Sequence, residues 1–384
     1  MNRSRTSTTL LGVGLGLAAT AVIVASRKRD AGAAINLFDA AEARSVNQAS
    51  FTQVPIIKQP LPTRVKALAR IMAGAGDITV DLLASGKVDL LASGKMASAV
   101  RSGGALKGAI MGFKRDGVTC VDKSIEGRDG PIKVRIYTPE ALETAPRPLV
   151  VEFHGGGWAV GDLSTADWIA STIARDLDAI VVSVDYRLSP THPFPAGLHD
   201  CYDALAWAAS NMEMLGARAK RLGVMGESAG GNLAAAVTLM AREQGGPVID
   251  HQVLLYPATD LRNSTRSRRQ NMKGPVLVGN ALDAFEESYA GKGDPTNDWR
   301  LSPLRARDKE NLPPALVQIA SYDPLYDDGV AYAEALRDAG VPTRLTAYTA
   351  MPHGYVNMPY FCRDAKAAMR EVVAEQRKYL RADR

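Results

Sequence analysis

The sequence is poor in the residues that build disulfide and metal sites. It holds three cysteines and five histidines in 384 residues. No Cys-x-x-Cys pair occurs, and no Cys/His cluster has the spacing of a zinc site. We therefore predict that Cys120, Cys201 and Cys362 are buried thiols without a redox or metal role.

A basic excess is also missing from most of the chain. The net charge of +5 comes entirely from residues 1–29, which contain five basic residues and no acidic one, and the rest of the chain is balanced. Since nucleic-acid binding needs clustered positive charge, we expect no nucleic-acid partner. The 46% hydrophobic and 23% charged residues are typical of a globular protein and exclude a disordered, collagenous or multi-span membrane chain.

An apolar run, LLGVGLGLAATAVIVA, fills residues 10–25 and has arginine or lysine on both sides. As a helix rising about 1.5 Å per residue it is slightly shorter than a bilayer core of about 30 Å. It fits a membrane anchor, a cleaved secretory signal or a terminal helix, although basic residues directly after the run are unusual at a cleavage site. We expect residues 1–29 to be a signal or anchor, and the protein to be membrane-anchored or exported to the cell envelope rather than cytoplasmic.

Residues 30–117 are rich in Ala, Leu and Gly and have few β-branched runs, which predicts several helices. The octapeptide VDLLASGK occurs at 80–87 and again at 88–95. Two copies are too few for a solenoid, so we interpret them as a local duplication in a peripheral helix.

From residue 118 onward, short β-rich runs alternate with helical stretches, so residues 118–384 are predicted to form one domain. An Asp-Gly turn at 129–130 predicts that the first two strands form an antiparallel pair. The later runs lack strict alternation, as expected for strands covered on both faces. Strands are expected at 118–125, 133–139, 148–153, 179–186, 221–226, 252–257, 315–320 and 343–348, and helices near 164–177, 196–215, 229–243, 329–339 and 362–381. The sequence therefore predicts an α/β fold whose mostly parallel sheet carries its chemistry at the carboxyl ends of the strands.

The segment Gly226-Glu227-Ser228-Ala229-Gly230 has the pattern GxSxG between a predicted strand and a predicted helix. Small residues permit the sharp, strained turn that exposes a nucleophilic serine. We therefore predict that Ser228 is a nucleophile.

A serine nucleophile needs a base, and that base needs an orienting acid. In this fold class the order is Ser, Asp or Glu, His, which leaves His251 and His353 after Ser228. His251 opens a strand, at the wrong end of the sheet, whereas His353 follows one. Asp323 also follows a strand directly, while Asp327 and Asp328 fall where a helix should begin. We predict His353 as base and Asp323 as acid.

The segment His154-Gly155-Gly156-Gly157-Trp158 follows another strand. Its glycines allow backbone N–H groups to converge on one point and, with the N–H of Ala229, to bind an oxyanion. His154 precedes Ser228, so we assign it to support of this loop rather than to proton transfer.

Together these segments resemble the hormone-sensitive lipase family of α/β-hydrolases, over about residues 120–360. The matching segments, in the family's order, are HGGGW at 154–158, DYRLSPTHPFPA at 185–196, GESAGG at 226–231, DWRLSPL at 298–304, DPLYDDG at 323–329 and HGY at 353–355. The resemblance implies an α/β-hydrolase fold and a carboxylesterase or lipase acting on acyl ester or lipid substrates without a cofactor. It also implies oxyanion donors at Gly156 and Gly157, with an amino-terminal helical cap at residues 30–117 that part of 262–297 completes. Many members of the family have aspartate where this chain has Glu227.

Two alternatives use the same fold. An amidase or peptidase would employ the same triad, and turnover of an amide would distinguish it from an esterase. A ligand receptor of this fold lacks a working histidine, so the presence of His353 favours the enzyme. The sequence leaves acyl length, alcohol and oligomeric state open.

Overall fold

The computed structural model describes residues 34–38, 54–66, 110–141 and 145–381. Its strands are β1 Ala34–Phe38, β2 Val118–Gly127, β3 Gly130–Pro139, β4 Leu149–Phe153, β5 Ile180–Asp185, β6 Leu222–Glu227, β7 His251–Leu255, β8 Ala315–Tyr322 and β9 Thr343–Pro352. Its α-helices are α5 Asp167–Ile173, α6 Ala196–Ser210, α7 Ala229–Glu243, α8 Arg266–Gln270, α9 Gly279–Ala290, α10 Tyr326–Asp338 and α11 Asp364–Leu380. Short turns of other helix types are η1 Leu163–Thr165, η2 Ala174–Asp178, η3 Pro303–Arg305 and η4 Tyr355–Asn357.

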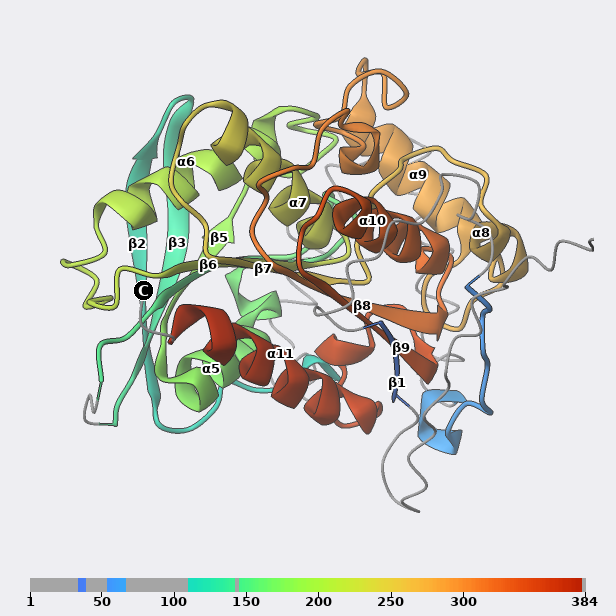
Figure 1. Ribbon diagram of the computed structural model, residues 1–384, viewed down its shortest axis with the longest axis horizontal. Coiled ribbons are helices and arrows are strands. Elements are labelled where there is room, and N and C mark those ends of the chain that lie inside the picture. Colours follow the sequence, from blue (N-terminus) through green and yellow to red (C-terminus); the bar gives the residue numbers. More distant parts are fainter. Residues whose placement is uncertain (1–33, 39–53, 67–109, 142–144, 382–384) are drawn as a thin grey trace, which may run out of the picture.

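The strands form one sheet in the order β1-β9-β8-β7-β6-β4-β5-β3-β2 (Figure 1). Neighbours from β5 through β4, β6, β7 and β8 to β9 are parallel, while β2, β3 and β1 join antiparallel at the two sides. Parallel neighbours place their carboxyl ends along one edge of the sheet, where the loops after β4, β6, β8 and β9 meet.

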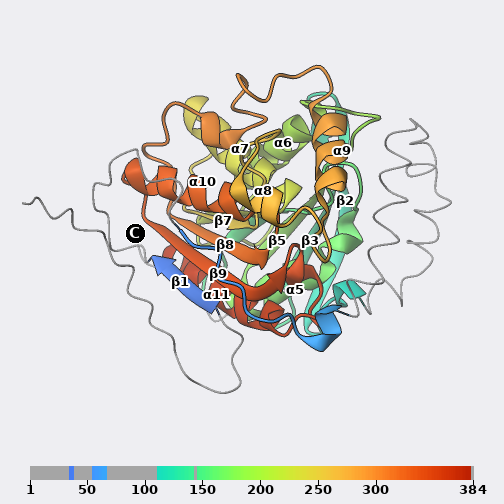
Figure 2. The ribbon, with the colours of Figure 1, turned by 90° about the vertical axis from the view of Figure 1, so that its right-hand side faces the viewer.

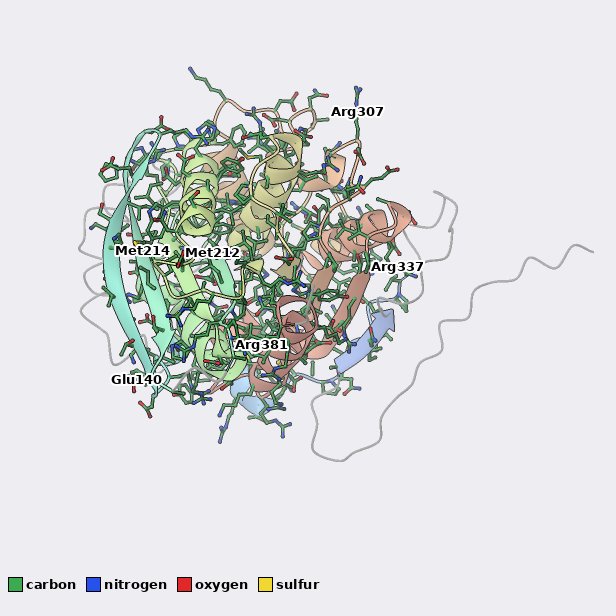
Figure 3. The ribbon with its side chains drawn as sticks, turned by 60° about the vertical axis from the view of Figure 1, so that its left-hand side comes forward. Glu140, Met212, Met214, Arg307, Arg337 and Arg381 are labelled. Atoms are coloured by element: carbon green, nitrogen blue, oxygen red, sulfur yellow. The ribbon has the colours of Figure 1, made fainter. Side chains whose placement is uncertain are left out.

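Helices cover both faces of the sheet. In Figures 1 and 2, α6, α7, α8, α9 and α10 lie on one face and α5 and α11 on the other. Consecutive residues of β4 point to opposite faces, so Val151 packs in the core under α6, α7 and α10 and Val150 in the core under α5 and α11. At the end of α11, Arg381 (Figure 3) donates to the Leu177 carbonyl and the Asp178 carboxylate of η2. The central strands are therefore buried on both sides.

The predicted mostly parallel sheet flanked by helices is confirmed. All eight strands predicted from residue 118 onward are present, each within a few residues of its expected bounds, and so are the five predicted helices. The hairpin at Asp129-Gly130 joins β2 to β3 antiparallel, with Gly127 paired to Gly130.

Other predictions are corrected. The helical interpretation of residues 30–117 misses β1, which pairs antiparallel with β9 at the edge of the sheet (Figure 2). Cys201 and Cys362 are buried, but Cys120 lies exposed on the edge strand β2. The VDLLASGK repeat lies outside the described residues. The division at residue 117 stays a prediction, because most of the predicted cap also lies outside them.

The predicted membrane-anchored or exported location is wrong. Within the described part of the chain, no helix combines the length and the apolar character needed to cross a bilayer. The run at 10–25 that motivated the prediction lies outside those residues.

Candidate active site

Ser228 lies at the turn between β6 and α7, in a strained backbone conformation with φ 58° and ψ −117°. The neighbouring glycines make this turn possible. A Cβ at Gly226 would lie 2.2 Å from the Gly230 carbonyl oxygen, and a Cβ at Gly230 would lie 1.9 Å from the Phe153 carbonyl oxygen. Only glycine fits at either position. The turn can therefore pack closely against the end of β4, and Ser228 projects from the edge of the sheet.

His353 lies between Ser228 and Asp323. Its Nε2 is 2.8 Å from the Ser228 Oγ, and its Nδ1 is 2.7 Å from the Asp323 Oδ2. Asp323 follows β8 and is fully buried, while His353 follows β9 and is 8% exposed. The second Asp323 oxygen accepts the N–H of Leu325 at 2.8 Å. An ionised carboxylate only accepts, so Nδ1 donates to Asp323 and Nε2 is left to accept the serine proton.

The other two candidates for these roles lie elsewhere. His251 begins β7, is fully buried and stacks on Tyr379, with ring centroids 4.8 Å apart. Asp327 accepts from the Arg266 guanidinium and the Ser267 N–H, so its carboxylate is bound to α8. Of the sequence candidates, the fold thus brings Ser228, His353 and Asp323 together.

The glycine loop after β4 lies beside the nucleophile, because a Cβ at Gly155 would lie 3.5 Å from the Ser228 Cβ. Gly156 has φ 131° and Gly157 has φ 59°, both of which favour glycine. The Gly156 carbonyl accepts the N–H groups of Ala159 and Val160, which closes a tight turn. Among the described residues, the N–H groups of Gly156, Gly157 and Ala229 have no hydrogen-bond acceptor. These three donors are therefore available to a ligand.

His154 directly precedes the glycines of this loop and supports it. Its ring stacks on Tyr186, with centroids 4.4 Å apart, and the Tyr186 hydroxyl donates to the His154 carbonyl at 2.7 Å. Its Nδ1 lies 2.8 Å from the Gly155 carbonyl oxygen. His154 contacts the loop backbone, as the sequence predicts.

Glu227, directly before the serine, accepts hydrogen bonds from two loops of the site. Its Oε1 accepts the Gly155 N–H at 2.9 Å and the Asn357 Nδ2 at 3.1 Å. Asn357 lies four residues after His353, and its Oδ1 accepts the Tyr256 hydroxyl at 2.8 Å. Burial is the main cause that raises the pKa of Glu227 to about 7. The glutamate thus links the glycine loop to the histidine loop.

Sequence reasoning missed two residues that touch the site from α8 and α9. Asn271, just after α8, donates from Nδ2 to the Asp323 carbonyl at 2.8 Å and holds the acid loop. Phe285 of α9 lies over the glycine loop, because a Cβ at Gly157 would meet its ring at 2.4 Å. Neither residue carries a local sequence signal, since each acts through contacts with segments more than fifty residues away.

A buried ion cluster attaches α8 and α9 to the sheet domain. Arg268 of α8 donates to both oxygens of Glu286 of α9, at 3.0 and 2.7 Å, and lies 3.3 Å from Asp328 of α10. The two carboxylates are buried, and burial raises the pKa of Asp328 to about 7 although Arg268 opposes this. Asp328, predicted only as a charge at a helix start, is therefore part of this cluster.

No group of three or more His, Cys, Asp or Glu side chains that could hold a metal ion occurs in the residues described here. The prediction of a reaction without a cofactor stays a prediction.

Comparison with known proteins gives one consistent result. A family model of the α/β-hydrolase fold matches residues 150–357. The chain is 44% identical over 238 residues to an esterase, LipI, of Mycobacterium tuberculosis, which covers 62% of this chain and 74% of that protein. It is 40% identical over 267 residues to the carboxylesterase NlhH of the same species, covering 68% and 83%.

Solved structures agree. An esterase of Pyrobaculum calidifontis superimposes with a TM-score of 0.72 at 32% identity, covering 83% of this chain and 99% of that one. A thermostable esterase from Pseudomonas putida superimposes with a TM-score of 0.75 at 31% identity, covering 85% and 99%. The sequence motifs, the fold and these relatives together show that the chain belongs to the α/β-hydrolases of the hormone-sensitive lipase type.

Proposed function

We propose that this protein hydrolyses carboxylic acyl esters, with Ser228 as nucleophile, His353 as general base and Asp323 as the acid that orients the histidine. The proposal rests above all on the continuous chain of hydrogen bonds from Asp323 through His353 to Ser228, at 2.7 and 2.8 Å. The relatives named as esterases and carboxylesterases supply the substrate class.

In the first half of the reaction, the Ser228 Oγ attacks the ester carbonyl carbon while its proton moves to the His353 Nε2. The carbonyl electrons move to the oxygen, and the N–H groups of Gly156, Gly157 and Ala229 are proposed to bind that oxyanion. Collapse of the tetrahedral intermediate breaks the bond to the alkoxide, which takes the proton from His353 and leaves as the alcohol. An acyl-enzyme on Ser228 remains.

In the second half, His353 removes a proton from water, and the resulting hydroxide attacks the acyl carbonyl. The intermediate collapses with release of the carboxylic acid, and the proton on His353 returns to Ser228. Asp323 keeps the imidazole in the required tautomer and stabilises the imidazolium in both halves.

A fluorophosphonate probe tests the nucleophile. We expect labelling of one peptide at Ser228, loss of ester hydrolysis on labelling, and a fall of several orders of magnitude in kcat for Ser228→Ala. Ser124 lies exposed on β2, and Ser124→Ala is the matched control. Labelling at another residue, or an active Ser228→Ala variant, would contradict the proposal.

The substrate class is tested with p-nitrophenyl esters of increasing acyl length and with the p-nitroanilide of the best acyl group. We expect ester turnover to exceed anilide turnover by orders of magnitude. The acyl length at which kcat/KM is highest then identifies the preferred substrate. Comparable rates on the anilide would favour an amidase.

A further inference from the structure

A pair of buried carboxyl groups, Glu152 of β4 and Glu227 of β6, lies beneath the glycine loop. We propose that Glu152 and Glu227 share one proton, and that the singly charged pair positions the oxyanion loop through Gly155. Neither residue touches the substrate in this proposal, which rests on the proposed ester hydrolysis. They act through the loop backbone.

The strand register brings the two side chains together. Glu152 is paired with Ser183 of β5 on one side and with Met225 of β6 on the other. Glu227 lies two residues after Met225, so its side chain is on the same face of the sheet as that of Glu152. Glu152 is fully buried and Glu227 is 1% exposed. Glu227 and the Ser183 hydroxyl both affect the pKa of Glu152, so the three side chains are neighbours.

Two ionised carboxylates would leave buried oxygen atoms of this pair without a hydrogen-bond donor. When both acids only accept, both oxygens of Glu152 and the Oε2 of Glu227 have no hydrogen-bond partner among the described residues. Buried polar atoms without partners are costly. A proton on Glu152 converts that group into a donor to the Oε2 of Glu227. One proton therefore joins the two carboxyl groups and gives a partner to one buried oxygen of each.

The surroundings also favour retention of this proton. Burial is the main cause that raises the pKa of Glu152 well above its ordinary value, and the neighbouring Glu227 adds to it. Within the described chain, no lysine or arginine pairs with either carboxylate, and Asp167 is already paired with Arg135. The groups that interact electrostatically or by hydrogen bonds with the pair are Tyr137 of β3, Asp167 of α5, Ser183 of β5, Tyr186 after β5, Cys201 of α6, Tyr256 after β7 and Asn357 of η4.

The charge of the pair reaches the active site through Glu227. With Glu152 protonated, the negative charge stays on Glu227, which accepts the Gly155 N–H and the Asn357 amide. A charged acceptor makes a stronger hydrogen bond than a neutral one. Gly155 precedes the proposed oxyanion donor Gly156, so this bond sets the position of the donor. Loss of the shared proton would place two negative charges in contact without water, and the carboxylates would have to separate.

Three variants test the proposal through the pH profile of kcat. Glu152→Gln keeps a donor toward Glu227 but has no acidic proton, so we expect it to remove the alkaline fall of kcat that the pair causes in the wild-type enzyme. Glu152→Leu cannot donate, and we expect about a tenfold lower kcat at every pH with little change in KM, the equivalent of one charge-assisted hydrogen bond. Glu126 is exposed on β2, and Glu126→Gln is the matched control. If the kcat of Glu152→Gln fell at alkaline pH in the same way as that of the wild type, the proposal would be overturned.

Infrared spectroscopy provides a test that does not need activity. At about pH 8.5, above the pKa values near 7 of Glu227, Asp328 and Glu334, the Ser228→Ala protein should show the carbonyl stretch of a buried protonated carboxyl group, and Glu152→Gln in that background should lose it. Absence of the band, or its persistence in the double variant, would overturn the shared proton even if Ser228 is the nucleophile. If the band is present but the protein has no ester hydrolase activity, the proposed function fails and the carboxyl pair stands as a structural feature.

Discussion

The His353 Nδ1 lies 2.7 Å from the Asp323 Oδ2, whereas Asp327, four residues further along the chain, has its carboxylate bound to α8. We therefore expect Asp323→Asn to lower kcat by roughly 10⁴-fold, because the amide would favour the wrong imidazole tautomer. Asp327→Asn serves as the control and should keep most of the activity while weakening the attachment of α8. Steady-state kinetics of both variants, with circular dichroism to confirm folding, decide the assignment. If Asp327→Asn lost its activity and Asp323→Asn kept it, Asp327 rather than Asp323 would be the orienting acid.

The oxyanion loop is tested at Gly156. A Cβ there would lie 2.0 Å from the Val160 carbonyl oxygen, and the φ of 131° disfavours any side chain. Gly156→Ala must therefore displace the loop, and we expect kcat to fall about 10²-fold or more, since one lost oxyanion donor has that effect.

Gly130 offers a matched control for that substitution. Its φ of 125° is nearly the same, but a Cβ there would contact nothing within 4 Å. Gly130→Ala should therefore lower the melting temperature through backbone strain and leave kcat unchanged. If Gly156→Ala raised KM with kcat intact, the loop would shape the substrate pocket rather than bind the oxyanion.

The sheet and the residues of the proposed triad could be predicted because their signals are local. The strands from β4 to β9 are rich in β-branched and apolar residues, and Ser228, Asp323 and His353 each follow such a strand. In a parallel sheet the loops after the strands meet at one edge, so residues far apart in sequence could be brought together by topology alone.

The remaining features depend on pairings that no local pattern shows. The five residues of β1 form a strand only because β9, more than 300 residues later, offers its edge. Glu152 occurs in an otherwise ordinary buried strand, and its partner is 75 residues away in β6. Asn271 and Phe285 likewise reach the site only after α8 and α9 pack on it. Long-range packing therefore decides the environment of the proposed catalytic residues, although the sequence predicts the residues themselves.

Phe285 is expected to limit the size of the substrate. Its ring contacts the glycine loop at Gly157 and is only partly buried. We therefore expect the ring to lie beside the proposed position of the reacting carbonyl. Phe285→Ala should raise kcat/KM for bulky esters relative to acetate by about tenfold, the usual effect of pocket size on discrimination. Asp283→Ala, at an exposed position of the same helix, is the control. An unchanged ratio of bulky to acetate ester rates would place Phe285 outside the pocket.

Glu227 is expected to make the stability of the protein fall as the pH rises. Because burial raises its pKa from 4.5 to about 7, the folded state binds more protons than the unfolded state between these values. The free energy of unfolding then decreases with pH in this window, by at most about 1.4 kcal/mol per pH unit for one proton. Glu227→Gln removes this contribution, so the difference in unfolding free energy between variant and wild type should shift in favour of the variant from pH 4.5 to 7.

Urea unfolding at several pH values measures this difference. The buried acid Asp328 also has a pKa raised to about 7, but it is present in both proteins and its effect cancels in the comparison. The exposed-site variant Glu126→Gln should follow the wild type at every pH. Since Glu227→Gln also removes a carboxylate next to Glu152, the pKa of Glu152 should fall, which adds to the same trend. If the wild-type and Glu227→Gln curves ran parallel from pH 4.5 to 7, the pKa of Glu227 would not be raised in the folded protein, and the proton of the pair would belong to Glu152 alone.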